Sequence, residues 1–137
     1  RYSLQSRGLG DVYKRQVLIS DPVWQADDYR IRSVAARALA VSGNIRAADF
    51  LIPRLQDDHP QVRWTAASAL GRLGDTRAVQ PLSALLADRH SEVRRQAVLS
   101  LGLLDARAMR AEVAQLARED ASDRVRRAAA QVRDALR

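Results

Sequence analysis

Apolar side chains recur at helical spacing in four segments of the chain. In the second segment, Val62, Ala66, Ala69, Leu70 and Leu73 fall at i, i+4, i+7, i+8 and i+11, which places them on one face of an α-helix. The other segments show the same spacing at Ile31, Ala35, Ala38 and Leu39, at Val93, Ala97, Leu101 and Leu104, and at Val125, Ala129, Val132 and Leu136. The pattern predicts four amphipathic helices of about four turns each.

A β-branched residue followed by arginine opens each segment. The pairs are Ile31-Arg32, Val62-Arg63, Val93-Arg94 and Val125-Arg126, spaced by 31, 31 and 32 residues. An acidic turn precedes each pair, and its aspartates are Asp27, Asp57, Asp88 and Asp120. Self-similarity at such a period is typical of solenoids, in which each repeat packs only on its neighbours.

A second, shorter helix is predicted in the latter half of each repeat. Its apolar positions are Ala48, Leu51 and Leu55, then Val79, Leu82 and Leu86, then Met109, Val113 and Leu116. Gly43 and Gly74 occupy matching positions where a left-handed residue can end the first helix. Pro53 lies deep in its segment, so we expect that helix to start late or to kink.

These features predict an all-α fold, a right-handed α-solenoid of about 3.5 repeats of ~31 residues. We expect one repeat domain over residues 17–137, and its repeats are 26–56, 57–87, 88–119 and an incomplete 120–137. The fourth repeat ends after its first helix, so we expect the apolar face of that helix to lack its cover. We interpret the chain as a fragment of a longer protein.

Residues 1–16 differ from the rest of the chain. They contain Lys14, the only lysine, and show no trace of the repeat. The stretch RYSLQSRGLGDVYKRQ resembles translated sequencing-adapter read-through, of the kind found at the ends of metagenome-derived reading frames. We therefore interpret residues 1–16 as a non-native leader, disordered or irregular, and exclude them from functional reasoning.

Composition limits the chemistry that the chain can perform. The net charge is +7, but residues 17–137 carry 19 arginines and 15 acidic residues, a net charge of +4. The absence of cysteine excludes disulfides and thiolate metal sites. No run approaches the ~18 apolar residues that a membrane span needs, so we expect no membrane association and favour a cytoplasmic location.

The repeat resembles a known family. The stretch VRWTAASALGRLGDTRAVQPLSALLAD, from Val62 to Asp88, is similar to the HEAT-like repeats of the phycobilisome-lyase type. The resemblance covers about residues 26–137. It implies a curved scaffold whose inner surface, lined by the second helices, holds a protein partner. Function is specified by sites on a fold rather than by the fold itself, so the partner stays open.

Some proteins with similar repeats are enzymes. Deoxyhypusine hydroxylase binds iron through His-Glu pairs that directly follow the Val-Arg pair. Here those positions hold Ser33-Val34, Trp64-Thr65, Arg95-Gln96 and Arg127-Ala128, none of them His-Glu. No nucleophile–base set or phosphate-binding glycine loop is visible either, so we predict no catalysis, no cofactor and no metal. His59 and His90 share one turn position, and we interpret them as surface residues of that turn.

Two sets of residues are candidates for structural or binding roles. We interpret Arg32, Arg63, Arg94 and Arg126 as members of a structural ladder with the turn residues Asp27, Asp57, Asp88 and Asp120, because an aspartate accompanies each arginine. The alternative is a basic track for phosphates. The candidate partner-binding surface comprises Trp64, Arg95 and Arg127, which follow the recurring pair at a position that varies, and Arg46, Arg77 and Arg110, which open second helices.

The sequence leaves three candidate functions. The favoured one is a protein–protein interaction scaffold or adaptor without catalysis. The alternatives are nucleic-acid binding through an arginine-rich face and a regulatory repeat region of a larger enzyme that truncation has removed. Salt-dependent DNA binding would indicate the second, since counterion release makes phosphate contacts weaken steeply with salt.

Overall fold

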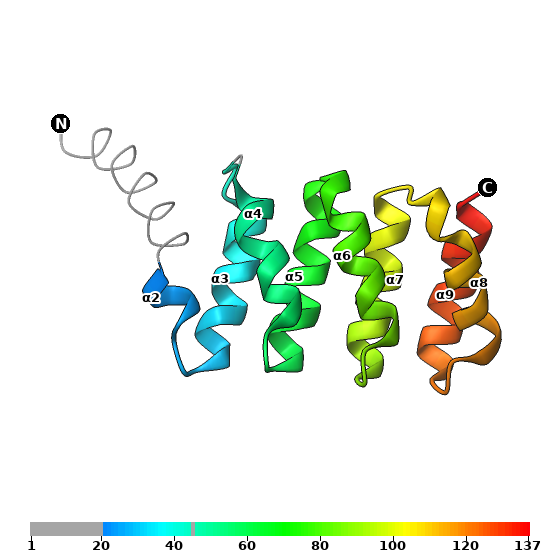
Figure 1. Ribbon diagram of the computed structural model, residues 1–137, viewed down its shortest axis with the longest axis horizontal. Helices are drawn as coiled ribbons and strands as arrows, with labels where there is room; N and C mark the ends of the chain where they lie inside the picture. Colours follow the sequence, from blue (N-terminus) through cyan, green and yellow to red (C-terminus); the bar gives the residue numbers. More distant parts are fainter. Residues whose placement is uncertain (1–20, 45) are drawn as a thin grey trace.

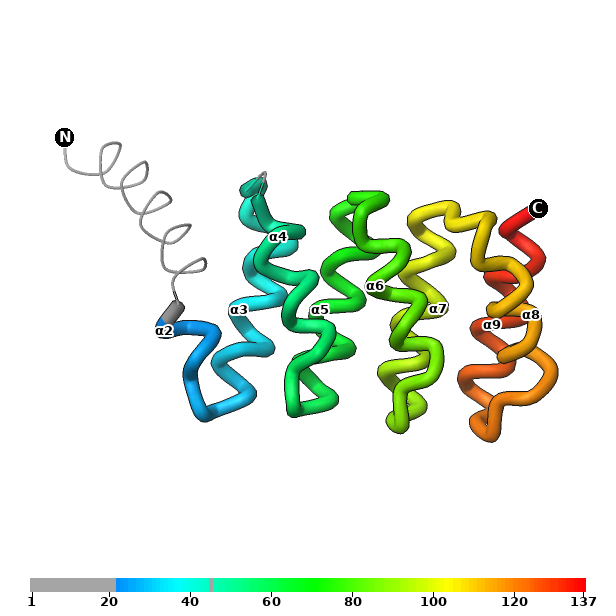
Figure 2. The backbone as a smooth tube through the Cα atoms, in the orientation of Figure 1, coloured from blue at the N-terminus to red at the C-terminus, as the bar shows by residue number. Residues whose placement is uncertain are grey.

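The computed structural model describes residues 21–44 and 46–137, and the described chain consists of helices joined by short turns, without a strand. The interpreted leader at residues 1–16 lies outside the described residues. Figure 1 shows helices standing side by side in a row, from α2 (Asp21–Trp24) at one end to α9 (Asp123–Ala135) at the other. The backbone tube in Figure 2 shows the same elongated stack. The expected all-α solenoid is confirmed.

The helices form two layers. The first layer contains α3 (Tyr29–Val41), α5 (Pro60–Leu73), α7 (Ser91–Leu103) and α9, which pack on one another in chain order. The second layer contains α4 (Ala47–Leu51) with the 3₁₀ helix η1 (Ile52–Gln56), α6 (Val79–Ala84) with η3 (Leu85–Ala87), and α8 (Arg110–Glu119). Two short 3₁₀ turns, η2 (Thr76–Ala78) and η4 (Arg107–Met109), lead into α6 and α8. Each second-layer helix packs against the first-layer helix that follows it.

The core follows the predicted apolar positions. Leu39, Leu70 and Leu101, at equivalent places in three repeats, are fully buried. Ile31 was predicted to lie on the same buried face as Val62, but its side chain is 51% exposed. Helix α5, which carries Val62, packs on both α3 and η1, whereas within the described residues only the short helix α2 precedes α3.

The turns between the two helices of a pair depend on a left-handed residue. Gly43 and Gly74 have φ of 68° and 72°, as predicted, and Asp105 takes the equivalent position in the third repeat with φ of 49°. An aspartate tolerates this conformation better than most residues because its short side chain bonds locally. Pro53 follows the point where α4 changes to the 3₁₀ helix η1, since proline offers no N–H for an α-helical bond.

The last helix is better covered than its sequence position predicted. Val125, Ala129, Val132 and Leu136 were expected to lack cover, because a second helix of their own repeat does not follow. All four are buried. Helix α9 packs against both α7 and α8 of the preceding repeat, and these contacts provide the cover.

Candidate binding surface

The recurring arginines bond to the carboxylates of the next repeat. The Nε atoms of Arg32, Arg63 and Arg94 each lie 2.8 Å from a carboxylate oxygen, in Asp57, Asp88 and Asp120 respectively. In each pair Nη2 donates to the other oxygen, at 2.9, 3.2 and 2.9 Å. These bidentate pairs, which we call rungs, join consecutive repeats, and two-point contacts of this kind are among the stronger ion pairs.

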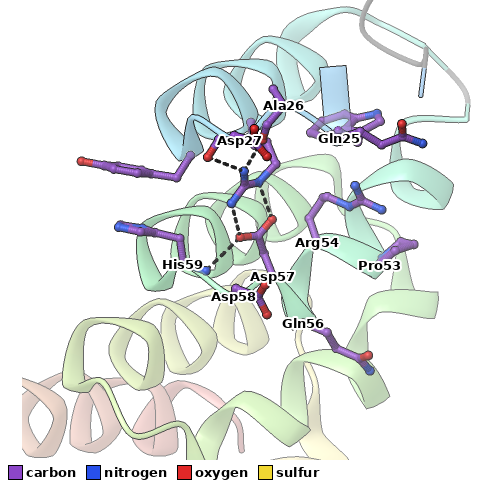
Figure 3. A pocket seen from close by; sticks show the side chains of 12 residues that line it. Gln25, Ala26, Asp27, Pro53, Arg54, Gln56, Asp57, Asp58 and His59 are labelled. Carbon is purple, nitrogen blue, oxygen red and sulfur yellow. Dashed lines mark hydrogen bonds and ion pairs between the residues drawn. The ribbon is translucent and has the colours of Figure 1, made fainter. Parts of the chain in front are cut away.

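The remaining guanidinium nitrogen of each rung bonds to the turn of its own repeat. Arg63 Nη1 donates to the carbonyl oxygens of Asp57 and Asp58, at 2.9 and 3.1 Å. Arg32 donates likewise to the carbonyls of Ala26 and Asp27. Figure 3 shows the labelled Ala26, Asp27 and Asp57 at this rung, with dashed lines for the bonds between the residues drawn. Asp27 therefore joins the ladder through its main chain, and the carboxylate partner of Arg32 is Asp57. Each arginine thus connects the turn that precedes its own helix to the turn that precedes the next first-layer helix.

Arg126 ends the ladder differently. Its Nη1 donates to the carbonyl oxygen of Asp120 at 2.5 Å, as in the other repeats. Its second contact is an ion pair with Asp123, three residues earlier in the same helix.

The rung aspartates also stabilise the turns that lead into the next first-layer helices. Their carboxylates accept the main-chain N–H of His59, His90 and Ser122 at 2.8 to 2.9 Å. Burial raises the pKa of Asp57 and of Asp88, but the bonds from Arg32 or Arg63 and from the N–H groups outweigh it, and the net pKa is lowered. At Asp120 the bond from Arg94 is the largest cause of a lowered pKa.

The lowered carboxylate pKa values predict acid sensitivity of the stack. In the unfolded chain these aspartates titrate near pH ~3.9, so the stability that they contribute is complete above that value and is lost as pH falls through the folded pKa. We expect a constant free energy of unfolding from about pH 7 to about pH 5, and a steep loss below about pH 4. Urea unfolding at stepped pH measures this. A stability that stays constant down to about pH 3 would contradict it.

The two histidines lie at the starts of first-layer helices. His59 Nδ1 accepts the N–H of Gln61 at 3.1 Å, and its ring stacks on Tyr29 with centroids 3.6 Å apart. His90 is exposed, and its Nδ1 lies 3.4 Å from Arg63 Nη2. Among the described residues, no three histidine or acidic side chains gather where they could hold a metal ion.

The six predicted binding residues fall on different layers. Trp64, Arg95 and Arg127 lie on the first-layer helices α5, α7 and α9, whereas Arg46, Arg77 and Arg110 lie where the second-layer segments begin. Several of them already have partners within the fold. Arg95 bonds to Glu92 at 3.0 Å, Arg77 to Asp75 and Asp49, and Arg46 lies 5.2 Å from the ring centroid of Phe50. Arg127 and Arg110 are exposed. The structure therefore does not bring the six together.

One of the six, Trp64, does line a hollow on the first layer. This hollow, of about 260 Å³, lies over α3, α5 and α7, and we call it the Trp64 pocket. Its lining is Arg37, Ala40, Trp64, Thr65, Ser68, Ala69, Arg72 and Gln96. Sequence reasoning missed Arg37 and Arg72. The spacing of Trp64, Ser68 and Arg72 at i, i+4 and i+8 was the signal that could have found Arg72.

Two comparisons bear on what this arrangement is. The sequence profile of HEAT repeats matches residues 19–101 and, in a second overlapping register, residues 48–133. A search of curated proteins found no significant match. No helix in the described part of the chain has the length and apolar composition to cross a bilayer. HEAT repeats commonly serve as protein-interaction scaffolds. The matched ranges cover most of the chain and agree with the stacked helix pairs, so the chain belongs to the HEAT repeat family.

Proposed function

We propose that the chain is a protein-binding scaffold without catalysis of its own. The observation that carries the proposal is the engagement of the recurring arginines inside the fold. Arg32, Arg63 and Arg94 each direct their guanidinium nitrogens to a carboxylate and to main-chain carbonyls. We infer that these residues serve to join repeats, as the ladder interpretation states, and that partners contact positions that differ between repeats.

The position directly after the ladder arginine changes its chemistry from repeat to repeat. It holds Ser33, Trp64, Arg95 and Arg127 in successive repeats. A constant framework that presents different side chains at equivalent places suits recognition of one particular partner. The same framework would also suit a regulatory repeat region of a larger enzyme.

Nucleic-acid binding is the less supported alternative. A phosphate track needs guanidinium groups that are free to displace counterions, and the rung arginines are bonded internally. A stacking platform for successive bases needs repeated aromatic side chains. Trp64 has no aromatic counterpart at Ser33, Arg95 or Arg127.

The function can be tested by selecting peptides from a random display library on the immobilised chain, with DNA binding measured in parallel by fluorescence anisotropy. We expect enriched peptide families that bind in solution, and weak DNA binding. A selection that yields no binding peptide, together with DNA affinity that falls by orders of magnitude between about 50 and about 200 mM salt, would overturn the proposal in favour of nucleic-acid binding.

A further inference from the structure

The Trp64 pocket presents two guanidinium groups without a carboxylate in its lining. Arg37 comes from α3 and Arg72 from the last turn of α5, and both are exposed. Within the part of the chain that the structure describes, neither makes an ion pair or a side-chain hydrogen bond. This distinguishes them from Arg77 and Arg95, which bond to nearby acids. Two uncompensated cations beside one hollow favour an anionic ligand.

The acidic residue on the α7 side of the pocket is already engaged. Glu92 accepts hydrogen bonds from Arg95 Nη1 and from Gln96 Nε2, both at 3.0 Å. Gln96 is the only one of these three that lines the pocket. The ion pair with Arg95 compensates the negative charge of Glu92. Glu92 therefore offsets little of the positive charge that Arg37 and Arg72 bring to the pocket.

Trp64 gives the pocket an apolar surface. The side chain is half-buried and packs against the core, so the indole is held in place while part of it stays accessible. Trp64, Ser68 and Arg72 share one face of α5, with steps of about 6 Å along the helix axis. A fixed aromatic surface next to a guanidinium group suits an apolar side chain that lies close to a carboxylate.

Exposed aliphatic residues flank Arg72 in the neighbouring repeats. Val41 and Leu103 occupy the positions one repeat before and one repeat after it, and their side chains are 79% and 66% exposed. Neighbouring first-layer helices lie roughly 8–10 Å apart. An extended segment that crosses α3, α5 and α7 would therefore meet an aliphatic residue, an arginine and a second aliphatic residue in turn.

From these observations we propose that the Trp64 pocket binds an acidic segment of a partner protein, with a carboxylate between Arg37 and Arg72 and an apolar side chain on Trp64. The inference rests on the proposed scaffold function and names the surface that carries it. A peptide is favoured over a nucleic acid because the two free cations of this pocket are accompanied by aliphatic rather than repeated aromatic side chains.

The test uses the full chain and a fluorescein-labelled peptide that alternates glutamates with leucines, beside an otherwise identical peptide with glutamines. We expect the glutamate peptide to bind and Arg37→Glu or Arg72→Glu to weaken binding at least ~10-fold each, since each reverses a charge at the contact. The glutamine peptide should bind at least ~10-fold more weakly than the glutamate peptide. Arg118→Glu, an equal charge change at an exposed second-layer position, should alter the affinity less than ~2-fold.

The indole provides a second readout. Peptide binding should change the tryptophan fluorescence of the unaltered chain, and Trp64→Phe should remove that change while Trp24 remains. Circular dichroism of every variant verifies that it is folded. The inference is overturned if Arg37→Glu and Arg72→Glu behave like Arg118→Glu, if the fluorescence change survives in Trp64→Phe, or if a DNA oligonucleotide binds this pocket more tightly than the glutamate peptide.

Failure of this inference can be told apart from failure of the scaffold function. Display-selected peptides whose affinity is indifferent to Arg37→Glu and Arg72→Glu would show that partners bind elsewhere on the scaffold. Absence of any selected peptide, together with strongly salt-dependent DNA binding, would remove both proposals.

Discussion

Replacement of Arg63 by methionine is expected to lower the free energy of unfolding by about 3–4 kcal/mol. The side chains of Arg63 and Asp88 are only 8% and 9% exposed, and the guanidinium group bonds to two turns at once. Methionine fills similar space without the charge. The substitution removes the guanidinium donor from the Asp88 carboxylate, which keeps only the N–H of His90, and from two carbonyls. Urea unfolding followed by circular dichroism measures the loss.

An exposed arginine offers a matched control. Arg77 also bonds to carboxylates, but its side chain is 59% exposed, so water screens the pairs and Arg77→Met should cost much less than Arg63→Met. The double variant Arg63→Met/Asp88→Leu should recover part of the stability, because it removes the isolated charge. If Arg63→Met and Arg77→Met cost the same, the rungs do not hold the repeats together.

Gly71→Ala is expected to destabilise the stack by about 2 kcal/mol, although alanine favours a helix over glycine by about 1 kcal/mol. A Cβ at position 71 would lie 2.6 to 2.8 Å from the Oγ, Cβ and Cα of Ser100. One of these atoms belongs to the main chain of α7, so relief requires α5 and α7 to separate. Separation would also weaken the 2.7 Å bond from Ser100 Oγ to the carbonyl oxygen of Ala67.

The equivalent glycine one repeat later provides the comparison. At Gly102 an added Cβ would lie 3.0 and 3.2 Å from the two methyl carbons of Val132, which belong to a side chain that can adjust. The gain in helix propensity then offsets much of the strain, and the change in unfolding free energy should stay within about 1 kcal/mol. Equal losses for Gly71→Ala and Gly102→Ala would show that this contact does not set the spacing of α5 and α7.

The sequence predicted the helix pairs and their turns because these depend on local periodicity. Gly43 and Gly74 marked the turns by their conformational freedom. Asp105 was not predicted to form such a turn, because an aspartate seldom takes the left-handed conformation. It was harder to predict which repeat supplies the carboxylate of each rung. An aspartate precedes every arginine at one period, so sequence spacing cannot distinguish a partner in the same turn from one in the next. Only the packing of α3 on α5 joins Arg32 to Asp57.

The candidate site was predictable only in part. Trp64 attracted attention because it departs from its counterparts in the other repeats. Arg37 and Arg72 follow no repeated pattern, and their place beside the same hollow depends on how α3 and α5 pack. From the sequence, Arg77 and Arg95 were candidates for binding a partner, but in the folded chain they form ion pairs with neighbouring acidic residues. Such pairing depends on side-chain geometry that composition does not reveal.

We infer that the rung arginines hold the repeats together while Arg37 and Arg72 bind the partner. The most direct test is the affinity of the glutamate–leucine peptide for Arg63→Met and for Arg72→Glu, measured side by side where both variants are folded. We predict that Arg72→Glu weakens binding at least ~10-fold and that Arg63→Met retains it within ~2-fold. Loss of binding in folded Arg63→Met with retention in Arg72→Glu would contradict the account.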